Sequence, residues 1–151
     1  VGESVLTAWA GMGRRNECPK GMRLTAWNGG MSVINPDERI DPRNQRAPRN
    51  KDHYANLKAQ AWFSLRARFE NAYKKKMGRE YDATHIISLP VDLPYLEQLQ
   101  DELCQPHKKE SGTGKVLVDK QPDGAQSPNL ADAVVMAFFP LSAKASILDV
   151  L

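Results

Sequence analysis

The longest helical pattern in the chain is the feature that most constrains its fold. From Lys51 to Lys76, apolar residues recur at intervals of three and four, as on the buried face of a helix. These residues are Tyr54, Leu57, Ala61, Leu65, Phe69 and Ala72. Asn50 is a good N-cap residue, the lysines at 74–76 favour the negative end of the helix dipole, and Gly78 is a stop signal. We therefore predict one long helix over 51–76.

Shorter patterns before and after this helix alternate between strand and helix. Strands are predicted over 22–27, 84–89 and 116–118, from their apolar or alternating residues. Helices are predicted over 1–10, over about 93–104 after an Asp92 cap, and from Pro128, after a Ser127 cap, to the proline at 140. Polar loops are predicted over 105–114 and 120–126. This alternation predicts an α/β fold.

The composition limits the class of protein. A length of 151 residues allows one ordinary domain, and 21 Lys and Arg residues face 18 Asp and Glu residues. No apolar run reaches membrane-spanning length, and neither a P-loop nor a dinucleotide-binding glycine motif is present in the sequence. Two cysteines are too few for a disulfide scaffold, so we interpret Cys18 and Cys104 as reduced intracellular thiols. Because the chain starts at Val1 without an initiator Met, we expect it to be processed or a piece of a longer protein.

Residues 31–50 form the least regular stretch. Three prolines exclude a continuous helix, and arginines recur every three or four residues, at Arg39, Arg43, Arg46 and Arg49. A loop of this length inside a compact domain is usually functional or disordered. Two interpretations stay open: the arginines bind nucleic-acid phosphates, or they belong to a solvated basic loop.

One acidic residue stands out in the last predicted helix. Asp132 lies in the first turns of a strongly apolar helix, between Ala131 and Ala133. A buried, unpaired carboxylate costs several kcal/mol, so Asp132 must face solvent, a cation or a hydrogen-bond donor. It is either a metal ligand or an acid that the helix dipole favours. Lys120 follows the last predicted strand, where it either contacts a phosphate or is solvated.

The run Ser127-Pro128-Asn129-Leu130-Ala131-Asp132-Ala133 resembles the closing motif of the nuclease domain of bacteriophage terminase large subunits. In that family, a run of the Ser-Pro-Asp-Leu-Ala-Asp-Ala type opens the last core helix. Residues 50–76 are similar to the family's long helix, and 116–120 resemble the strand and lysine before the motif. Val1-Gly2-Glu3-Ser4 is similar to the segment that follows the family's second catalytic carboxylate. The resemblance covers most of the chain.

The resemblance implies a ribonuclease H-like fold of the two-metal nuclease and integrase type, incomplete at its N-terminal strands. Residues 1–140 would be the C-terminal part of this nuclease domain, and 141–151 a C-terminal tail. Such sites hold two Mg²⁺ or Mn²⁺ ions with three or more carboxylates, and Asp132 would be the last of these. The family's first two acids match no position here, so we expect the chain alone to be inactive. Lys120 and the four arginines are the candidate nucleic-acid contacts.

The function that the resemblance implies is metal-dependent endonuclease cleavage of concatemeric genomic DNA during viral packaging. The implied partners are double-stranded DNA, an upstream packaging ATPase domain, the portal and the small terminase subunit, in the cytoplasm of the host cell and without a membrane. Two alternatives stay open. One is a Holliday-junction resolvase or transposase-like nuclease of the same fold, and the other is a non-catalytic module that binds DNA or a partner protein.

Overall fold

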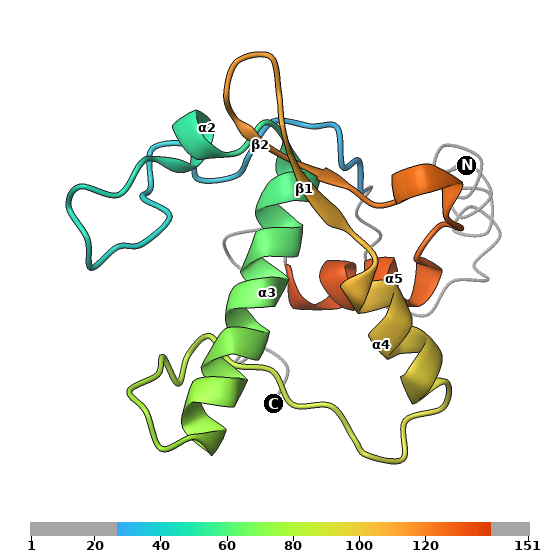
Figure 1. The fold of residues 1–151 in the computed structure, drawn as a ribbon. Coiled ribbons are helices and arrows are strands. Elements are labelled where there is room, and N and C mark those ends of the chain that lie inside the picture. The colour runs from blue at the N-terminus through green and yellow to red at the C-terminus, as the bar shows by residue number, and fades with distance from the viewer. Residues whose placement is uncertain (1–26, 140–151) are drawn as a thin grey trace, which may run out of the picture.

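The computed structural model of the chain describes residues 27–139. Five helical elements and two strands occur in this range (Figure 1). In chain order they are α2 (Asn50–His53), α3 (Leu57–Lys76), α4 (Leu96–Cys104), β1 (His107–Glu110), β2 (Val116–Asp119), the 3-10 turn η1 (Pro122–Gly124) and α5 (Asn129–Phe138). The predicted helix over 1–10, the predicted strand over 22–27 except its last residue, and the tail at 141–151 lie outside the described residues.

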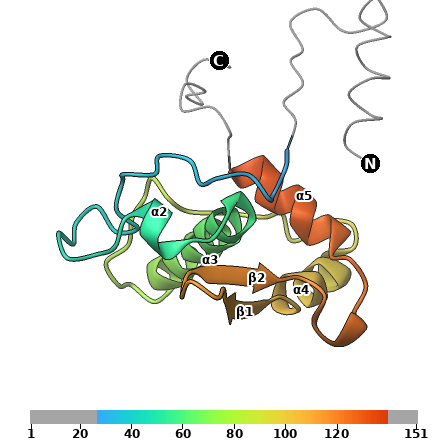
Figure 2. The ribbon, with the colours of Figure 1, turned by 90° about the horizontal axis from the view of Figure 1, so that it is seen from above.

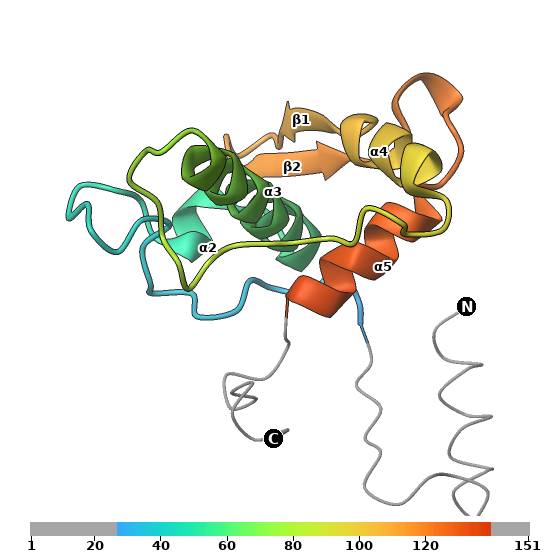
Figure 3. The same cartoon turned by 90° about the horizontal axis from the view of Figure 1, so that it is seen from below.

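The long helix α3 is the centre of the arrangement. Figures 2 and 3 show the β1–β2 hairpin on one side of α3 and α5 on the other, with α4 beside α5. The buried core lies between these elements. It consists of Leu57, Ala59, Ala61, Trp62, Leu65, Ile87, Leu99, Val118, Ala131, Val135 and Phe139. Helices around a small antiparallel sheet agree with the predicted α/β class at the level of mixed structure.

The sheet consists of two antiparallel strands in the register His107 with Asp119 and Glu110 with Val116. The prediction of a strand at 116–118 is confirmed, and its valines are buried in the core. The prediction of a loop over all of 105–114 is wrong, because β1 lies within it. All four residues of β1 are exposed and polar. Backbone pairing with β2 therefore makes β1 a strand, and its sequence has no apolar pattern that predicts one.

The predicted helix over 51–76 is interrupted. The short helix α2 ends at His53, and α3 begins at Leu57. Between them, Tyr54 forms a parallel bridge with Val116, and the Ala55 amide donates to the Val116 carbonyl at 2.9 Å. Pairing with β2 thus replaces helical hydrogen bonds at this point.

The predicted Asn50 cap is also wrong. The side-chain amide of Asn50 donates to the carbonyl of Asn35 at 3.0 Å, and no side chain caps α2. The cap of the long helix is Asn56, whose side chain accepts from the amide of Ala59 at 3.0 Å. The end of the helix at Lys76, with three lysines in its last turn, agrees with the prediction.

The predicted strand over 84–89 does not form. Within residues 27–139 this segment has no strand partner, although Ile87 is buried as expected of its apolar centre. Side chains of α3 bind its backbone instead. The Asn71 amide donates to the His85 carbonyl at 2.8 Å, and Arg68 donates to the Ile86 carbonyl at 3.2 Å. The apolar run over 84–89 is therefore a loop, which hydrogen bonds from α3 side chains hold against that helix.

Two further predicted caps differ from the structure. Helix α4 begins at Leu96 after Tyr95, which has a left-handed backbone with φ of 61°, so Asp92 does not cap it. No side chain of a neighbouring position caps α5, so Ser127 does not act as its cap. The predicted end of this helix before the proline at 140 is confirmed. Within residues 27–139, no helix is both long and apolar enough to cross a membrane.

Candidate functional site

The structure brings two of the predicted site residues together. Lys120 follows β2 directly, and Asp132 lies in the first turn of α5. The ammonium group of Lys120 donates a hydrogen bond to the Asp132 carboxylate, so the two form an ion pair. Their side chains retain only 23% and 25% of their exposure. Asp132 therefore faces a donor, as its apolar surroundings require.

The connection between β2 and α5 is fixed by Gln105, which follows α4. Its side-chain amide donates to the carbonyl of Lys120 at 2.5 Å and to the carbonyl of Gln126 at 2.8 Å. These two carbonyls lie near the two ends of the loop between β2 and α5. One side chain thus closes the loop and positions Lys120 next to α5.

The N-terminus of α5 is capped from a distant part of the chain. The Glu102 carboxylate, on α4, accepts from the backbone amides of Leu130 at 2.6 Å and Ala131 at 3.0 Å. Desolvation raises the pKa of Glu102, but hydrogen bonds from Ala131, Gln98 and Leu130 outweigh it, so the pKa lies below its ordinary value. An anion at this end of the helix also complements the helix dipole. Glu102 therefore fixes the turn of α5 that carries Asp132.

Asp132 and Lys120 line a pocket of about 340 Å³. Its other lining residues come from the segment before α2, the first turns of α3, and α5. They are Trp27, Gly29, Gly30, Asn56, Lys58, Trp62, Val135 and Met136. Among the described residues, the pocket lining thus combines one carboxylate and two lysines with the aromatic rings of Trp27 and Trp62. Lys58 is not among the predicted site residues, because the helix predicted over 51–76 places it in a helix interior.

The four candidate arginines lie outside this pocket, in a loop that projects from the body of the molecule at the left of Figure 1. Arg39 and Arg49 form an isolated antiparallel bridge at its base. The guanidinium of Arg39 donates to the Ala47 carbonyl at 2.5 Å, and that of Arg49 donates to Asp37 at 3.0 Å. These two side chains build the loop.

The other two arginines lie nearer the tip of the loop. Arg43 is 3.5 Å from Asp41, in an exposed ion pair. Arg46 is exposed, and among residues 27–139 its side chain has no ion-pair or hydrogen-bond partner. The arginine segment is therefore an ordered hairpin rather than a loose loop, and Arg46 is its most available cation.

A two-metal site needs more carboxylate ligands than the described residues offer at one place. Within 27–139, no group of three or more His, Cys, Asp or Glu side chains is arranged to hold a metal ion. Among the described residues, Asp132 is the one carboxylate in the lining of its pocket. Its hard oxygen atoms suit Mg²⁺ or Mn²⁺ as a single ligand, but one carboxylate does not hold two ions.

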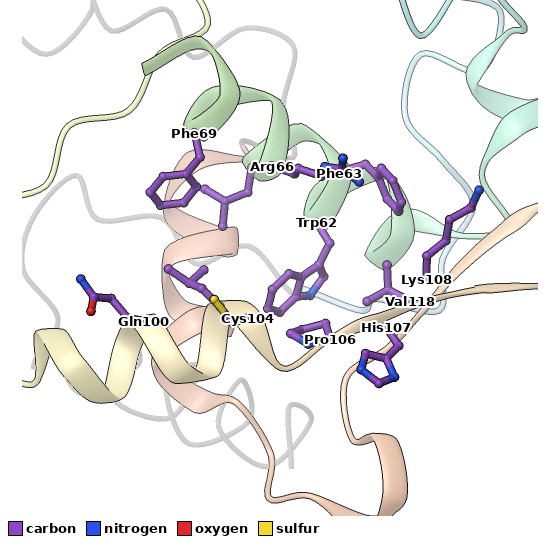
Figure 4. A pocket seen from close by; sticks show the side chains of 12 residues that line it. Trp62, Phe63, Arg66, Phe69, Gln100, Cys104, Pro106, His107, Lys108 and Val118 are labelled. Carbon is purple, nitrogen blue, oxygen red and sulfur yellow. The ribbon is translucent and has the colours of Figure 1, made fainter. Parts of the chain in front are cut away.

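A second pocket, of about 410 Å³, has a different character. It lies between α3, α4 and the start of β1, where Trp62, Phe69 and Pro106 line it (Figure 4). Among the described residues, its lining contains the cations Arg66 and Lys108 and the imidazole of His107, but no carboxylate. It therefore lacks the ligands for metal chemistry, and the Asp132 pocket is the better candidate site.

Comparison with solved structures finds the nuclease domain of a phage terminase. The nuclease domain of the large terminase subunit gp2 of bacterial virus Sf6 matches with a TM-score of 0.70 and 29% identity, over 88% of this chain and 61% of that one. The resemblance to a terminase nuclease domain is confirmed. No protein-family model matches the chain, and no curated protein does.

Two further terminase structures are variants of the same Sf6 domain in which a lysine is replaced by alanine. One, with manganese and beta-thujaplicinol, matches with a TM-score of 0.70 and 28% identity, over 88% of this chain and 61% of that one. The other, with calcium, matches with a TM-score of 0.69 and 29% identity, over 87% and 60%. This chain thus spans about three-fifths of the terminase nuclease domains that it matches.

Proposed function

We propose that this chain is the C-terminal part of the metal-dependent endonuclease domain of a viral DNA-packaging terminase. The observation that carries the proposal is the match to the Sf6 nuclease domain at 29% identity over 88% of this chain. The ion pair between Lys120 and Asp132, which lies in the motif that opens α5, supports it. In the complete protein the domain has a ribonuclease H-like fold and cuts concatemeric DNA.

In this proposal, Asp132 is a ligand of a divalent cation. The similar Sf6 domain has been solved with manganese and with calcium. A divalent cation supplies Lewis-acid activation of water and phosphate to a nuclease of this type. Lys120 balances the Asp132 carboxylate when the cation is absent. Within residues 27–139 the pocket has one carboxylate, so we expect these residues by themselves not to cleave DNA.

The proposed partners follow from the same relationship. The substrate is double-stranded DNA, which Lys120, Arg39, Arg43, Arg46 and Arg49 contact through its phosphates. An ATPase domain of the same subunit, the portal and the small terminase subunit complete the packaging machine in the host cytoplasm. The exposed Arg46 and the ordered arginine hairpin support a phosphate contact at this surface.

The test is a titration of the chain with Mn²⁺, in which electron paramagnetic resonance measures the concentration of the free ion. We expect the Asp132→Asn variant to lose the binding of Mn²⁺, and a plasmid cleavage assay with Mn²⁺ to show no product. Asp119→Asn is the matched control, because Asp119 is also paired with a lysine, Lys109 at 2.6 Å, but lies outside the pocket. Equal Mn²⁺ binding by wild type and Asp132→Asn would contradict the proposal.

A further inference from the structure

Lys58 is a cation in the Asp132 pocket to which neither the sequence nor the comparisons assign a role. It is the second residue of α3, and its side chain lines the pocket together with Asp132 and Lys120. Lys58 is half-buried. Within residues 27–139, its ammonium group has no carboxylate partner and donates no hydrogen bond. A structural ion pair in this part of the chain therefore does not explain its position.

The position of Lys58 is unfavourable for its own helix. The N-terminal end of a helix carries a partial positive charge, so a lysine in the first turn is repelled. The first turn of α3 contains no acidic residue to offset this repulsion. A cation held at such a place is available to an anion that approaches from outside.

Two backbone contacts fix where Lys58 lies. Its amide donates to the Gly29 carbonyl at 2.9 Å, and the Leu57 amide donates to the Met31 carbonyl at 2.8 Å. A Cβ atom at Gly29 would lie 3.0 Å from the Cβ atom of Lys58. Glycine at 29 thus lets the segment before α2 lie directly against α3, and the stem of Lys58 is held beside the pocket.

The charges of the described residues in the pocket do not cancel. Asp132 is neutralised by Lys120, which leaves the ammonium of Lys58 as an excess positive charge. The backbone amides at the start of α3 are already used: that of Ala59 by the Asn56 side chain, and those of Leu57 and Lys58 by the preceding segment. An anion in this pocket would therefore meet the side chain of Lys58 and not the helix end.

We propose that Lys58 binds a backbone phosphate of duplex DNA next to Asp132. This inference rests on the proposed nuclease function and names a residue that positions its substrate. A lysine ammonium is a compact point charge that binds phosphate without a fixed geometry. With Lys120 paired to Asp132, Lys58 is the cation of the described pocket lining that is left to hold a phosphate near the carboxylate. Lys58 is thus a positioning residue, and its loss weakens DNA binding without abolishing the binding of a cation by Asp132.

The test measures binding of a fluorescently labelled 20-base-pair duplex by anisotropy, in EDTA and at NaCl concentrations from 50 to 200 mM. Each phosphate contact contributes about 0.9 to the slope of log affinity against log salt. We expect Lys58→Gln to reduce this slope by about one contact, and Lys58→Arg to restore it. The matched control is Lys76→Gln, which removes the same charge at the other end of α3, about 27 Å away at 1.5 Å per residue. Circular dichroism establishes that each variant is folded.

The outcomes separate this inference from the proposed function. A slope that is equal in wild type and Lys58→Gln, or reduced equally by Lys76→Gln, would overturn the role of Lys58. Absence of duplex binding by the wild-type chain would overturn it as well. The Mn²⁺ titration tests the proposed function independently: we expect Lys58→Gln to retain Mn²⁺ binding. Loss of Mn²⁺ binding in Lys58→Gln would show a structural role and also contradict the inference.

Discussion

Lys120 and Asp132 form an ion pair across the loop that joins β2 to α5, twelve residues apart in the sequence. Each side chain keeps about a quarter of its exposure, so water screens the pair only in part. The pair places a cation where the proposed divalent ion would bind. Lys120 and a metal ion therefore compete for the same carboxylate.

Removal of Lys120 is expected to strengthen metal binding. In Lys120→Met, Mn²⁺ no longer displaces an ammonium group, and its affinity rises about fivefold, as for a pair worth ~1 kcal/mol. The measurement is isothermal titration calorimetry. Lys109→Met is the control, because Lys109 pairs with Asp119 in the β1–β2 hairpin, outside the Asp132 pocket. An affinity for Mn²⁺ that is unchanged or weaker in Lys120→Met would contradict this competition.

Glu102 is expected to stabilise the fold through α5. Glu102→Ala leaves the amides of Leu130 and Ala131 without their acceptor. Loss of a helix cap costs about 1 kcal/mol, so the free energy of unfolding in urea falls by that amount. Asp101→Ala is the control, because it removes a neighbouring carboxylate of α4 that caps no helix. Equal stability of Glu102→Ala and Asp101→Ala would rule out this capping role.

The arginines of the hairpin over residues 39–49 are expected to differ in their contribution to DNA binding. Arg46 is exposed and has no partner within the described residues, whereas Arg49 is paired with Asp37. Arg46→Gln reduces the salt slope of duplex binding by about 0.9, and Arg49→Gln reduces it less. Anisotropy titrations at several salt concentrations measure both slopes. The reverse order would show that the pair of Arg49 with Asp37 opens on DNA.

His85 is expected to make the fold less stable in mild acid. Burial, and secondly the charge of Arg68, hold the pKa of His85 below its ordinary value of 6.5. The unfolded chain therefore binds a proton that the folded chain excludes, and the free energy of unfolding falls as the pH drops below about 6.5. His53 has the same direction of pKa shift, again caused first by burial.

The corresponding variant is His85→Gln, which keeps a donor near the Ser64 carbonyl, 3.2 Å from the ring nitrogen. We expect urea unfolding between pH 7 and pH 5 to show a weaker pH dependence than in wild type. His107→Gln is the control, because His107 is exposed. A pH dependence that stays at the wild-type value would assign it to other groups.

The sequence predicted the elements whose apolar pattern matches their burial. The apolar face of α3, the valines of β2 and the end of α5 belong to this class, because packing and local signals agree there. It did not predict features that depend on distant partners. The break at Tyr54 needs Val116, the strand β1 needs β2, and the loop at 84–89 is held by Asn71 and Arg68.

The candidate site shows the same division. Asp132 was singled out because a carboxylate in an apolar helix needs a partner, and that partner is Lys120. Glu102 and Gln105 were missed, since their roles arise from contacts with residues more than ten positions away. Lys58 was missed because the predicted helix began at residue 51, whereas α3 begins at Leu57. Once the Asn56 cap is known, a lysine in the first turn of a helix without acids is itself a signal.

The most direct test of the account is a crystal of this chain soaked in Mn²⁺, with anomalous diffraction measured to locate the ion. The account predicts an anomalous peak within coordination distance of the Asp132 carboxylate, with the ammonium of Lys120 displaced from it. The same soak of Asp132→Asn should give no peak in this pocket. A Mn²⁺ ion bound elsewhere, with Lys120 and Asp132 still paired, would contradict the account.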